Sequence, residues 1–137
     1  MDSTTDPVRN LASELQQFTG CDQVYQHSLV RKLVYTEGIR YLCEKTKSFW
    51  LLDAVASYFA SSEMMKAIDK DPRLKDFQVW TIAVKEDRSA SITMRADSDT
   101  PPAITQDINW TDFPLDEVRM WVGFDGSRWT LYLPSEH

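Results

Sequence analysis

The chain has 137 residues, which is enough for one ordinary domain with a real hydrophobic core. A hydrophobic share of 42% and an aromatic share of 12% exclude a wholly disordered chain. The net charge of −6 gives an acidic surface that repels phosphate. We therefore expect no direct binding to nucleic acid, whereas a basic protein partner is compatible with this charge.

The N-terminal residues, the hydrophobic segments and the cysteines bear on the cellular compartment of the protein. Residues 1–6 lack the basic and apolar regions of a secretion signal, and we expect them to form a disordered tail. No segment is long and apolar enough to span a bilayer, so no membrane partner is expected. Cys21 and Cys43 are too few for a disulfide scaffold, and we expect both to be reduced. The prediction is a cytoplasmic protein in which residues 7–137 form a single domain.

Helical patterns fill the first half of the chain. Residues 6–7, an aspartate followed by proline, are typical of a helix start, and apolar residues follow at helical spacing. A short strand is expected around residues 31–35. Thr36 then caps a second helix, which runs through Lys47.

The stretch from Phe49 to Phe59 is the most hydrophobic of the chain. As a helix it is apolar nearly all round, which predicts a central helix inside the domain, with Ser48 as its N-cap. Asp53 is the exception within it, because a carboxylate in apolar surroundings costs free energy unless it is paired or hydrogen-bonded. The helical half ends before Pro72, since a residue preceding proline is pushed out of helical geometry.

From Phe77 onward the period changes from helical to two, which predicts strands. Residues 77–85 are apolar on both faces, as in a central strand, while residues 90–96 alternate as in a half-exposed one. A two-residue turn at residues 125–126 predicts a final hairpin in which Phe124 pairs with Ser127. The whole pattern predicts an α+β domain, with N-terminal helices packed on one face of a C-terminal antiparallel sheet of four to six strands.

Four short motifs resemble those of a known family. They are YTEGIRYL at residues 35–42, WLLD at 50–53, DFPL at 112–115 and LPSE at 133–136. From about residue 11 onward the chain is similar to small uncharacterised bacterial proteins, a domain of unknown function often encoded on plasmids, phages or other mobile elements. The resemblance implies no catalytic residue. It implies a setting in which anti-defence (anti-CRISPR-like) or regulatory proteins occur, although family membership does not fix function.

Two sets of residues are candidates for catalysis. Cys21 and His27 lie close in sequence and could be a nucleophile and its base, but their spacing does not ensure hydrogen-bond reach. Asp53 is either a general acid or base, or a structural carboxylate, and we favour the structural interpretation. A small hydrolase or transferase that uses these residues in a helix–sheet cleft is the alternative function. We assign no catalytic residue, no metal site and no cofactor.

The outward face of the predicted sheet has the composition of a binding interface. It should present Arg95, Arg119, Trp121, Arg128 and Tyr132. Exposed Trp, Tyr and Arg are typical of interface hot spots. In the predicted register Arg119 faces Tyr132 near Trp121, so a cation–π contact is available. The competing interpretation is that residues 24–35, or a dimer mate, cover this face.

Acidic residues adjoin the predicted face. Six acids and no Lys or Arg lie between Arg95 and Arg119, and we add Asp112 and Asp116 to the partner-binding residues. Such a run either faces a basic partner or is a solvated rim. We thus expect a non-enzymatic protein-interaction module with a protein partner, an accessory or anti-defence factor of a mobile element. Self-association into a homodimer through the free face is a further hypothesis.

Overall fold

The computed structural model describes residues 7–18 and 23–137, so the predicted tail at residues 1–6 and Cys21 lie outside the described residues. In this part the helices are α1 (Pro7–Leu15), α2 (Glu37–Thr46), α3 (Phe49–Phe59) and α4 (Ser62–Lys70), with short 3-10 helices η2 (Pro72–Lys75) and η3 (Pro134–Glu136). The strands are β1 (Val24–Gln26), β2 (Leu33–Thr36), β3 (Phe77–Val84), β4 (Ala90–Arg95), β5 (Ile104–Ile108), β6 (Glu117–Phe124) and β7 (Trp129–Tyr132).

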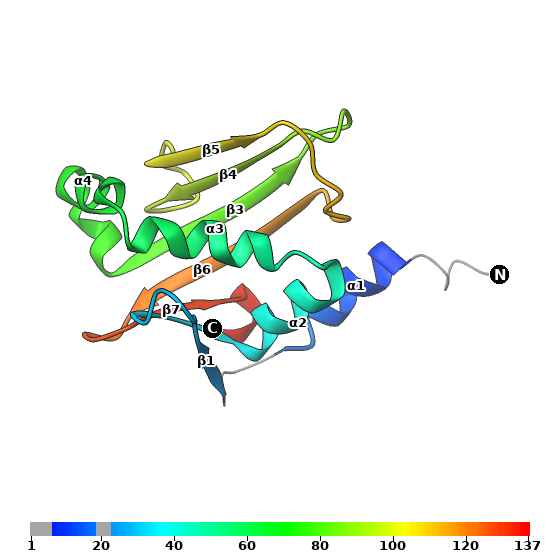
Figure 1. The fold of residues 1–137 in the computed structure, drawn as a ribbon, viewed down its shortest axis with the longest axis horizontal. Helices are drawn as coiled ribbons and strands as arrows, with labels where there is room; N and C mark the ends of the chain where they lie inside the picture. Colours follow the sequence, from blue (N-terminus) through cyan, green and yellow to red (C-terminus); the bar gives the residue numbers. More distant parts are fainter. Residues whose placement is uncertain (1–6, 19–22) are drawn as a thin grey trace.

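The strands form one sheet in the order β1-β2-β7-β6-β3-β4-β5, and the helices α2, α3 and α4 lie over one face of it (Figure 1). We call this the inner face and the opposite one the outer face. Every neighbouring pair is antiparallel except β2 and β7, which are parallel. The α+β class, with helices mainly N-terminal and strands mainly C-terminal, is confirmed.

Among the described residues the sheet has seven strands, whereas the sequence pattern predicts four to six. The additional pairing comes from the N-terminal half, where β1 and β2 extend the sheet beyond β7. The strand expected around residues 31–35 corresponds to β2. Since β1 has three residues, it carries too short a pattern for its alternation to be recognised.

The start of α2 agrees with the sequence. Thr36 is its N-cap, and the side-chain oxygen accepts a hydrogen bond from the backbone N–H of Ile39 (3.4 Å). Ser48 precedes α3 as expected, but its hydroxyl makes no capping hydrogen bond and instead contacts the hydroxyl of Thr46. Ser48 is therefore a buried link between the two helices rather than a side-chain cap.

The prediction that the central helix is buried on all sides is wrong. The buried residues of α3 are Leu51, Leu52, Val55 and Ala56, whereas the Asp53 side chain is 68% exposed. In Figure 1, α3 lies across the strands, in a layer separate from the sheet. A helix in a two-layer fold has one face toward the sheet and the other toward water, so its solvent side can carry a carboxylate.

The core is centred on Trp80 of β3, which is fully buried. Its ring lies 5.7 Å from that of Tyr58 and 6.3 Å from that of Phe59, both on α3. Its indole N–H donates to Oε1 of the buried Gln78 (2.9 Å), and Gln78 Nε2 donates to the carbonyl of Leu74 (3.0 Å). The side-chain amide therefore links the central strand to η2 and leaves the buried indole nitrogen satisfied.

The hairpin between β6 and β7 exists, but its predicted register is wrong by two residues. Phe124 pairs with Trp129 rather than with Ser127, and Trp121 lies opposite Tyr132. Because side chains alternate between the faces with a period of two, this shift keeps each side chain on its predicted face.

The turn itself explains the shift. Gly126 has a positive φ of 101°, as expected. Asp125 precedes the bend of the β6–β7 turn and stabilises this bend through its side chain. The Asp125 carboxylate accepts hydrogen bonds from the backbone N–H groups of Ser127 (2.9 Å) and Arg128 (2.7 Å). These bonds hold the pKa of Asp125 below its usual range.

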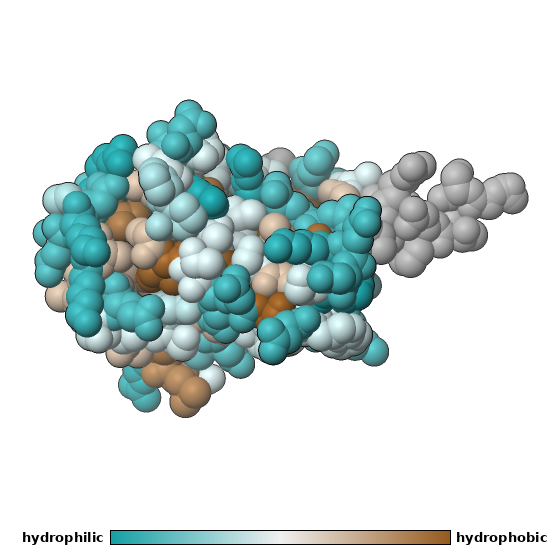
Figure 2. All heavy atoms as spheres, turned by 90° about the horizontal axis from the view of Figure 1, so that it is seen from above, coloured by the Kyte–Doolittle hydropathy of each residue, from teal (hydrophilic) through white to brown (hydrophobic). Residues whose placement is uncertain are grey.

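The exterior is largely polar. Figure 2, seen from above relative to Figure 1, shows hydrophilic side chains over most of this side, with hydrophobic ones in smaller areas between them. Four large hydrophobic side chains are exposed: Leu29, Phe49, Met65 and Trp110. No helix in the described part of the chain is both long and apolar enough to cross a membrane.

Candidate protein-binding surface

A row of side chains crosses four neighbouring strands on the outer face. Tyr132 of β7 lies opposite Trp121 of β6, Trp121 opposite Val79 of β3, and Val79 opposite Arg95 of β4. Directly opposed residues in antiparallel strands share one face of the sheet, so these four residues form a continuous row, in which Val79 is buried beneath its neighbours. Trp121 and Tyr132 are both half-buried, so neither is sealed within the interior.

The aromatic residues of this face form a cluster, which we define as Phe77, Trp121, Tyr132 and His137. The Trp121 ring meets Phe77 (5.4 Å, 75°) and Tyr132 (6.1 Å, 88°) edge to face. His137 stacks on Tyr132 at 5.9 Å, and its Nδ1 lies 2.9 Å from the tyrosine hydroxyl oxygen. Edge-to-face pairs at these distances are favourable, so the cluster holds its rings in a fixed arrangement.

Two arginines lie beside the aromatic cluster. Arg119 is opposite Thr81 and lies two residues before Trp121 on the same face of β6. Its side chain is 54% exposed. Arg119 Nε lies 3.9 Å from Glu117 Oε1, and Arg95 Nη1 donates to Thr93 Oγ1 (2.7 Å). Because the true register places Trp121, not Arg119, opposite Tyr132, the expected pairing of Arg119 with Tyr132 is wrong.

Cation–π contacts do occur elsewhere among the described residues. The Arg40 guanidinium lies 4.7 Å from the centre of the Tyr25 ring, and Lys45 Nζ lies 5.4 Å from that of Tyr41. The Arg40–Tyr25 pair joins α2 to β1, whereas the Lys45–Tyr41 pair lies within α2. Neither pair involves Arg95 or Arg119 of the outer face.

The remaining predicted partner-binding residues are not gathered with this cluster. Arg128 lies in the β6–β7 turn with its Nε 4.0 Å from Asp125 Oδ2. Asp116 precedes β6 and lies five residues before Trp121, roughly 17 Å away along an extended strand. Asp112 lines a cavity beside Trp50, on the inner side of the β5 edge. The other four predicted residues share the outer face, whereas these three lie at separate places.

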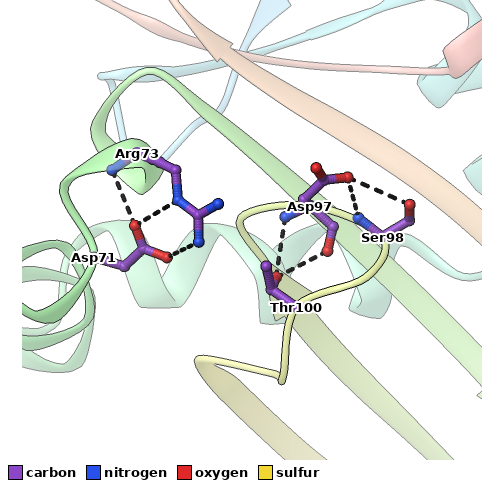
Figure 3. A network of polar contacts seen from close by, with 5 residues as sticks. All are labelled: Asp71, Arg73, Asp97, Ser98 and Thr100. Carbon is purple, nitrogen blue, oxygen red and sulfur yellow. Dashed lines mark hydrogen bonds and ion pairs between the residues drawn. The ribbon is translucent and has the colours of Figure 1, made fainter.

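The acidic loop after β4 bonds mainly to itself. The Asp97 carboxylate accepts from the backbone N–H of Ser98 (2.6 Å), and the Thr100 hydroxyl donates to the Asp97 carbonyl (2.9 Å). Figure 3 shows this turn beside the turn at Asp71, whose carboxylate accepts from Arg73 Nε (2.9 Å) and Nη2 (2.7 Å). The side-chain bond from Arg73 lowers the pKa of Asp71. Both turns have the self-bonded geometry of ordinary surface loops.

Asp53 and His27 form a pair that the sequence reading did not join. His27 is buried, and its Nε2 lies 2.9 Å from Asp53 Oδ1. Its Nδ1 accepts hydrogen bonds from the backbone N–H groups of Leu29 (3.1 Å) and Val30 (3.0 Å). Since Nδ1 accepts, Nε2 carries the proton and donates it to the carboxylate. Both ring nitrogens are thereby occupied in fastening the β1–β2 loop to α3.

Glu136 is a buried carboxylate whose role was not predicted from the sequence. Its buried carboxylate accepts from the Thr36 hydroxyl (2.6 Å) and from the backbone N–H groups of Gly38 (3.2 Å) and Leu133 (2.9 Å). These residues belong to the YTEGIRYL and LPSE motifs, which the fold brings together. The carboxylate lies at the N-terminus of α2, where the helix dipole favours negative charge. This arrangement anchors η3 to α2.

Cys43 is buried against α3, and its surroundings favour the protonated thiol. Burial raises the pKa of its thiol to about 12, so the thiolate fraction near pH 8 is negligible. The unfolded thiol ionises first, near pH 9, so this residue makes folding less favourable as the pH rises from about 9 to 12.

We predict that Cys43 does not react with a thiol reagent while the protein is folded. In a Cys21→Ser variant, labelling with a disulfide reagent at pH 8 should stay near zero over minutes and become stoichiometric in concentrated urea. The urea sample is the control for reagent and thiol. Rapid stoichiometric labelling of the folded variant would show that the thiol is accessible.

The described residues gather no group of three or more His, Cys, Asp or Glu that could hold a metal ion. What they define is an α+β protein with a helical layer on one face of the sheet and an aromatic and arginine surface on the other. Residues 9–137 match DUF6876, a family of unknown function, and the chain belongs to this family. No curated protein and no solved structure matches the chain.

Proposed function

We propose that the chain is a non-enzymatic protein-interaction module that binds a protein partner through the outer face. The supporting observation is the aromatic cluster on the side of the sheet opposite the helices, with Arg95 and Arg119 beside it. Half-buried Trp and Tyr held by packing, together with Arg, have the composition of residues that dominate binding energy. Rigid rings also lose little conformational entropy on association.

The chemistry of this face specifies features of the partner. Arg95 and Arg119 call for carboxylates on the partner at matching positions, since charged groups across an interface are complementary. Gly123 lies between Phe77 and Thr130 on neighbouring strands, and the Tyr132 ring lies beside it, 3.8 Å from the position a Cβ would occupy. We expect an apolar side chain of the partner, flanked by acidic residues of the partner, to pack against these rings.

The biological setting rests on the resemblance to proteins of mobile elements. We include in the proposal that the module is an accessory or anti-defence factor, whose role is to occupy a surface of a host protein. Small acidic proteins without a catalytic site suit such a role because binding alone is sufficient for inhibition. Both nitrogens of the His27 ring are engaged, with Asp53 and with the backbone, which favours this proposal over the alternative of a small hydrolase or transferase that uses Asp53, or Cys21 with His27.

We predict that Trp121→Ala and Tyr132→Ala each weaken partner binding at least ~30-fold, since hot-spot truncations cost about 2 kcal/mol or more. The partner would first be identified by affinity purification from the native host, and its Kd would then be measured by calorimetry with purified protein. Circular dichroism would verify that each variant is folded.

Phe49→Ala is the matched control, because Phe49 is an exposed aromatic residue on the helical side. It should leave the Kd unchanged. Equal affinity of wild type, Trp121→Ala and Tyr132→Ala would exclude the outer face as the binding surface. A stable homodimer in light scattering that these two substitutions dissociate would instead identify a second copy as the occupant.

A further inference from the structure

A cavity lies where the start of α3 approaches the edge strand β5, on a part of the molecule that the proposed function does not use. We call it the tryptophan cavity. Its volume is about 240 Å³, and it is lined by Trp50, Gln106, Ile108, Trp110, Thr111 and Asp112. This is below the ~300–1,000 Å³ typical of pockets that hold whole small molecules, so its size matches one large side chain.

Two indole rings line this cavity, and one of them is strongly exposed. Trp110 has 65% of its surface exposed, although tryptophan is usually well buried. The cavity is held in place by neighbouring contacts, because the Tyr58 hydroxyl of α3 donates to Gln106 Oε1 of β5 (3.0 Å). An exposed aromatic surface beside a preformed hollow is typical of a ligand-binding site.

The charge around the cavity is negative. The exposed Asp112 lies in its wall, and no Lys or Arg occurs in the sequence between Arg95 and Arg119. Arg88 reaches the loop that carries Asp112, but its Nε and Nη2 donate to the backbone carbonyls of Thr111 (3.1 Å) and Phe113 (2.5 Å), and Arg88 does not line the cavity. Among the described residues no cation lies within ion-pair distance of Asp112. The cavity therefore combines aromatic faces and a carboxylate, and lacks a cation of its own.

We propose that the tryptophan cavity binds an arginine side chain of a protein partner. A guanidinium stacks on the face of an indole and pairs through two parallel hydrogen bonds with a carboxylate, which the Trp110 and Asp112 side chains provide. An ammonium group lacks the planar stacking surface, and a neutral side chain can donate hydrogen bonds to Asp112 but gains no charge–charge attraction from it. The acidic net charge of the chain steers a basic segment toward it.

The test uses ¹⁵N-labelled protein and the peptide acetyl-Gly-Arg-Gly-amide, with the citrulline peptide as its neutral match. The arginine peptide should shift the indole N–H signals of Trp50 and Trp110 saturably, and added salt should reduce the effect. Trp121 on the outer face is the internal control and should not shift. The citrulline peptide should bind ~3-fold more weakly, a factor within the range for the loss of one exposed charge pair.

Two variants sharpen the test. Asp112→Asn should weaken the arginine peptide by the same ~3-fold factor and leave the citrulline peptide unaffected, whereas Trp110→Ala should abolish saturable shifts. Equal binding of the two peptides, equal binding of a lysine peptide, or shifts that include Trp121 would each overturn the assignment, as would no shift at all. Since the outer face takes no part in these readouts, they are independent of the outcome for Trp121→Ala.

Discussion

Glu136→Ala is expected to lower the free energy of unfolding by about 3–5 kcal/mol, a large part of the stability of an ordinary domain. The substitution removes a buried carboxylate that accepts three hydrogen bonds, from Thr36, Gly38 and Leu133. Hydrogen bonds to charged groups contribute about 1.5–3 kcal/mol each, and their donors would be left unpaired in a buried site. Urea unfolding followed by circular dichroism measures the change.

Gly38→Ala tests the same contact from the other side. A Cβ at this position would lie 2.6 Å from Glu136 Oε1 and 2.8 Å from Leu133 Cδ1, so a side chain must move. We expect a cost of about 2–3 kcal/mol from this overpacking, although alanine in place of glycine normally stabilises a helix by about 1 kcal/mol. With Glu136 already replaced by alanine, the cost of Gly38→Ala should be at least halved.

Glu37→Ala is the matched control for both substitutions. Glu37 is also a carboxylate in the first turn of α2, but it is exposed and bonds to the hydroxyl of Tyr25 (2.6 Å). We expect a loss of no more than about 1 kcal/mol. A similar loss for Glu37→Ala and Glu136→Ala, or additive effects of Gly38→Ala and Glu136→Ala, would contradict the anchoring role of Glu136.

The parts of the fold predicted from sequence are those with a long local period. Strand β3 is apolar on both faces over eight residues and β4 alternates over six, so the limits of both are found nearly correctly. The start of α2 at Thr36 and the end of α4 before Pro72 are also marked by local sequence. In contrast, the parallel pairing of β2 with β7 depends on contacts such as that between Leu33 and Trp129, almost a hundred residues apart. No local pattern records such a contact.

The register of the last hairpin shows a second limit. Alternation fixes the face of each side chain but is unchanged by a shift of two residues, so it cannot distinguish the true pairing of Trp121 with Tyr132 from the predicted one. The turn decides between them, through the side chain of Asp125. Placement on the outer face was accordingly predictable, whereas the neighbours of each residue on that face were not.

The candidate sites follow the same division. That Asp53 needs a partner could be inferred from its apolar neighbours in sequence, but its partner His27 lies 26 residues away and its exposure follows from the two-layer fold. The tryptophan cavity joins Trp50 to Trp110 and Asp112, which only the packing of α3 beside β5 brings together. The WLLD and DFPL motifs contain Trp50, Asp53 and Asp112 but do not indicate what these residues touch.

Trp80→Ala is expected to lower the free energy of unfolding by about 4–5 kcal/mol, at the upper end of the range for truncating a buried aromatic residue. Trp80 is 0% exposed to solvent and packs against Tyr58 and Phe59. Its removal leaves a large cavity and an unpaired oxygen on Gln78. Urea unfolding monitored by circular dichroism gives the change in midpoint at constant slope.

Gln78→Leu separates the polar contribution from the packing. It leaves the indole N–H of Trp80 and the carbonyl of Leu74 without their partner, which should cost about 2–3 kcal/mol with little change in volume. Trp129→Ala is the matched control, because this tryptophan is half-buried and should cost less than Trp80→Ala. If Trp129→Ala were the more damaging substitution, the core would be centred on β7 instead. Trp80→Ala should therefore lower the free energy of unfolding more than Gln78→Leu or Trp129→Ala does. Because Trp80 is fully buried, water cannot replace the contacts that Trp80→Ala removes. For the same reason, water cannot pair with the indole N–H that Gln78→Leu leaves without a partner.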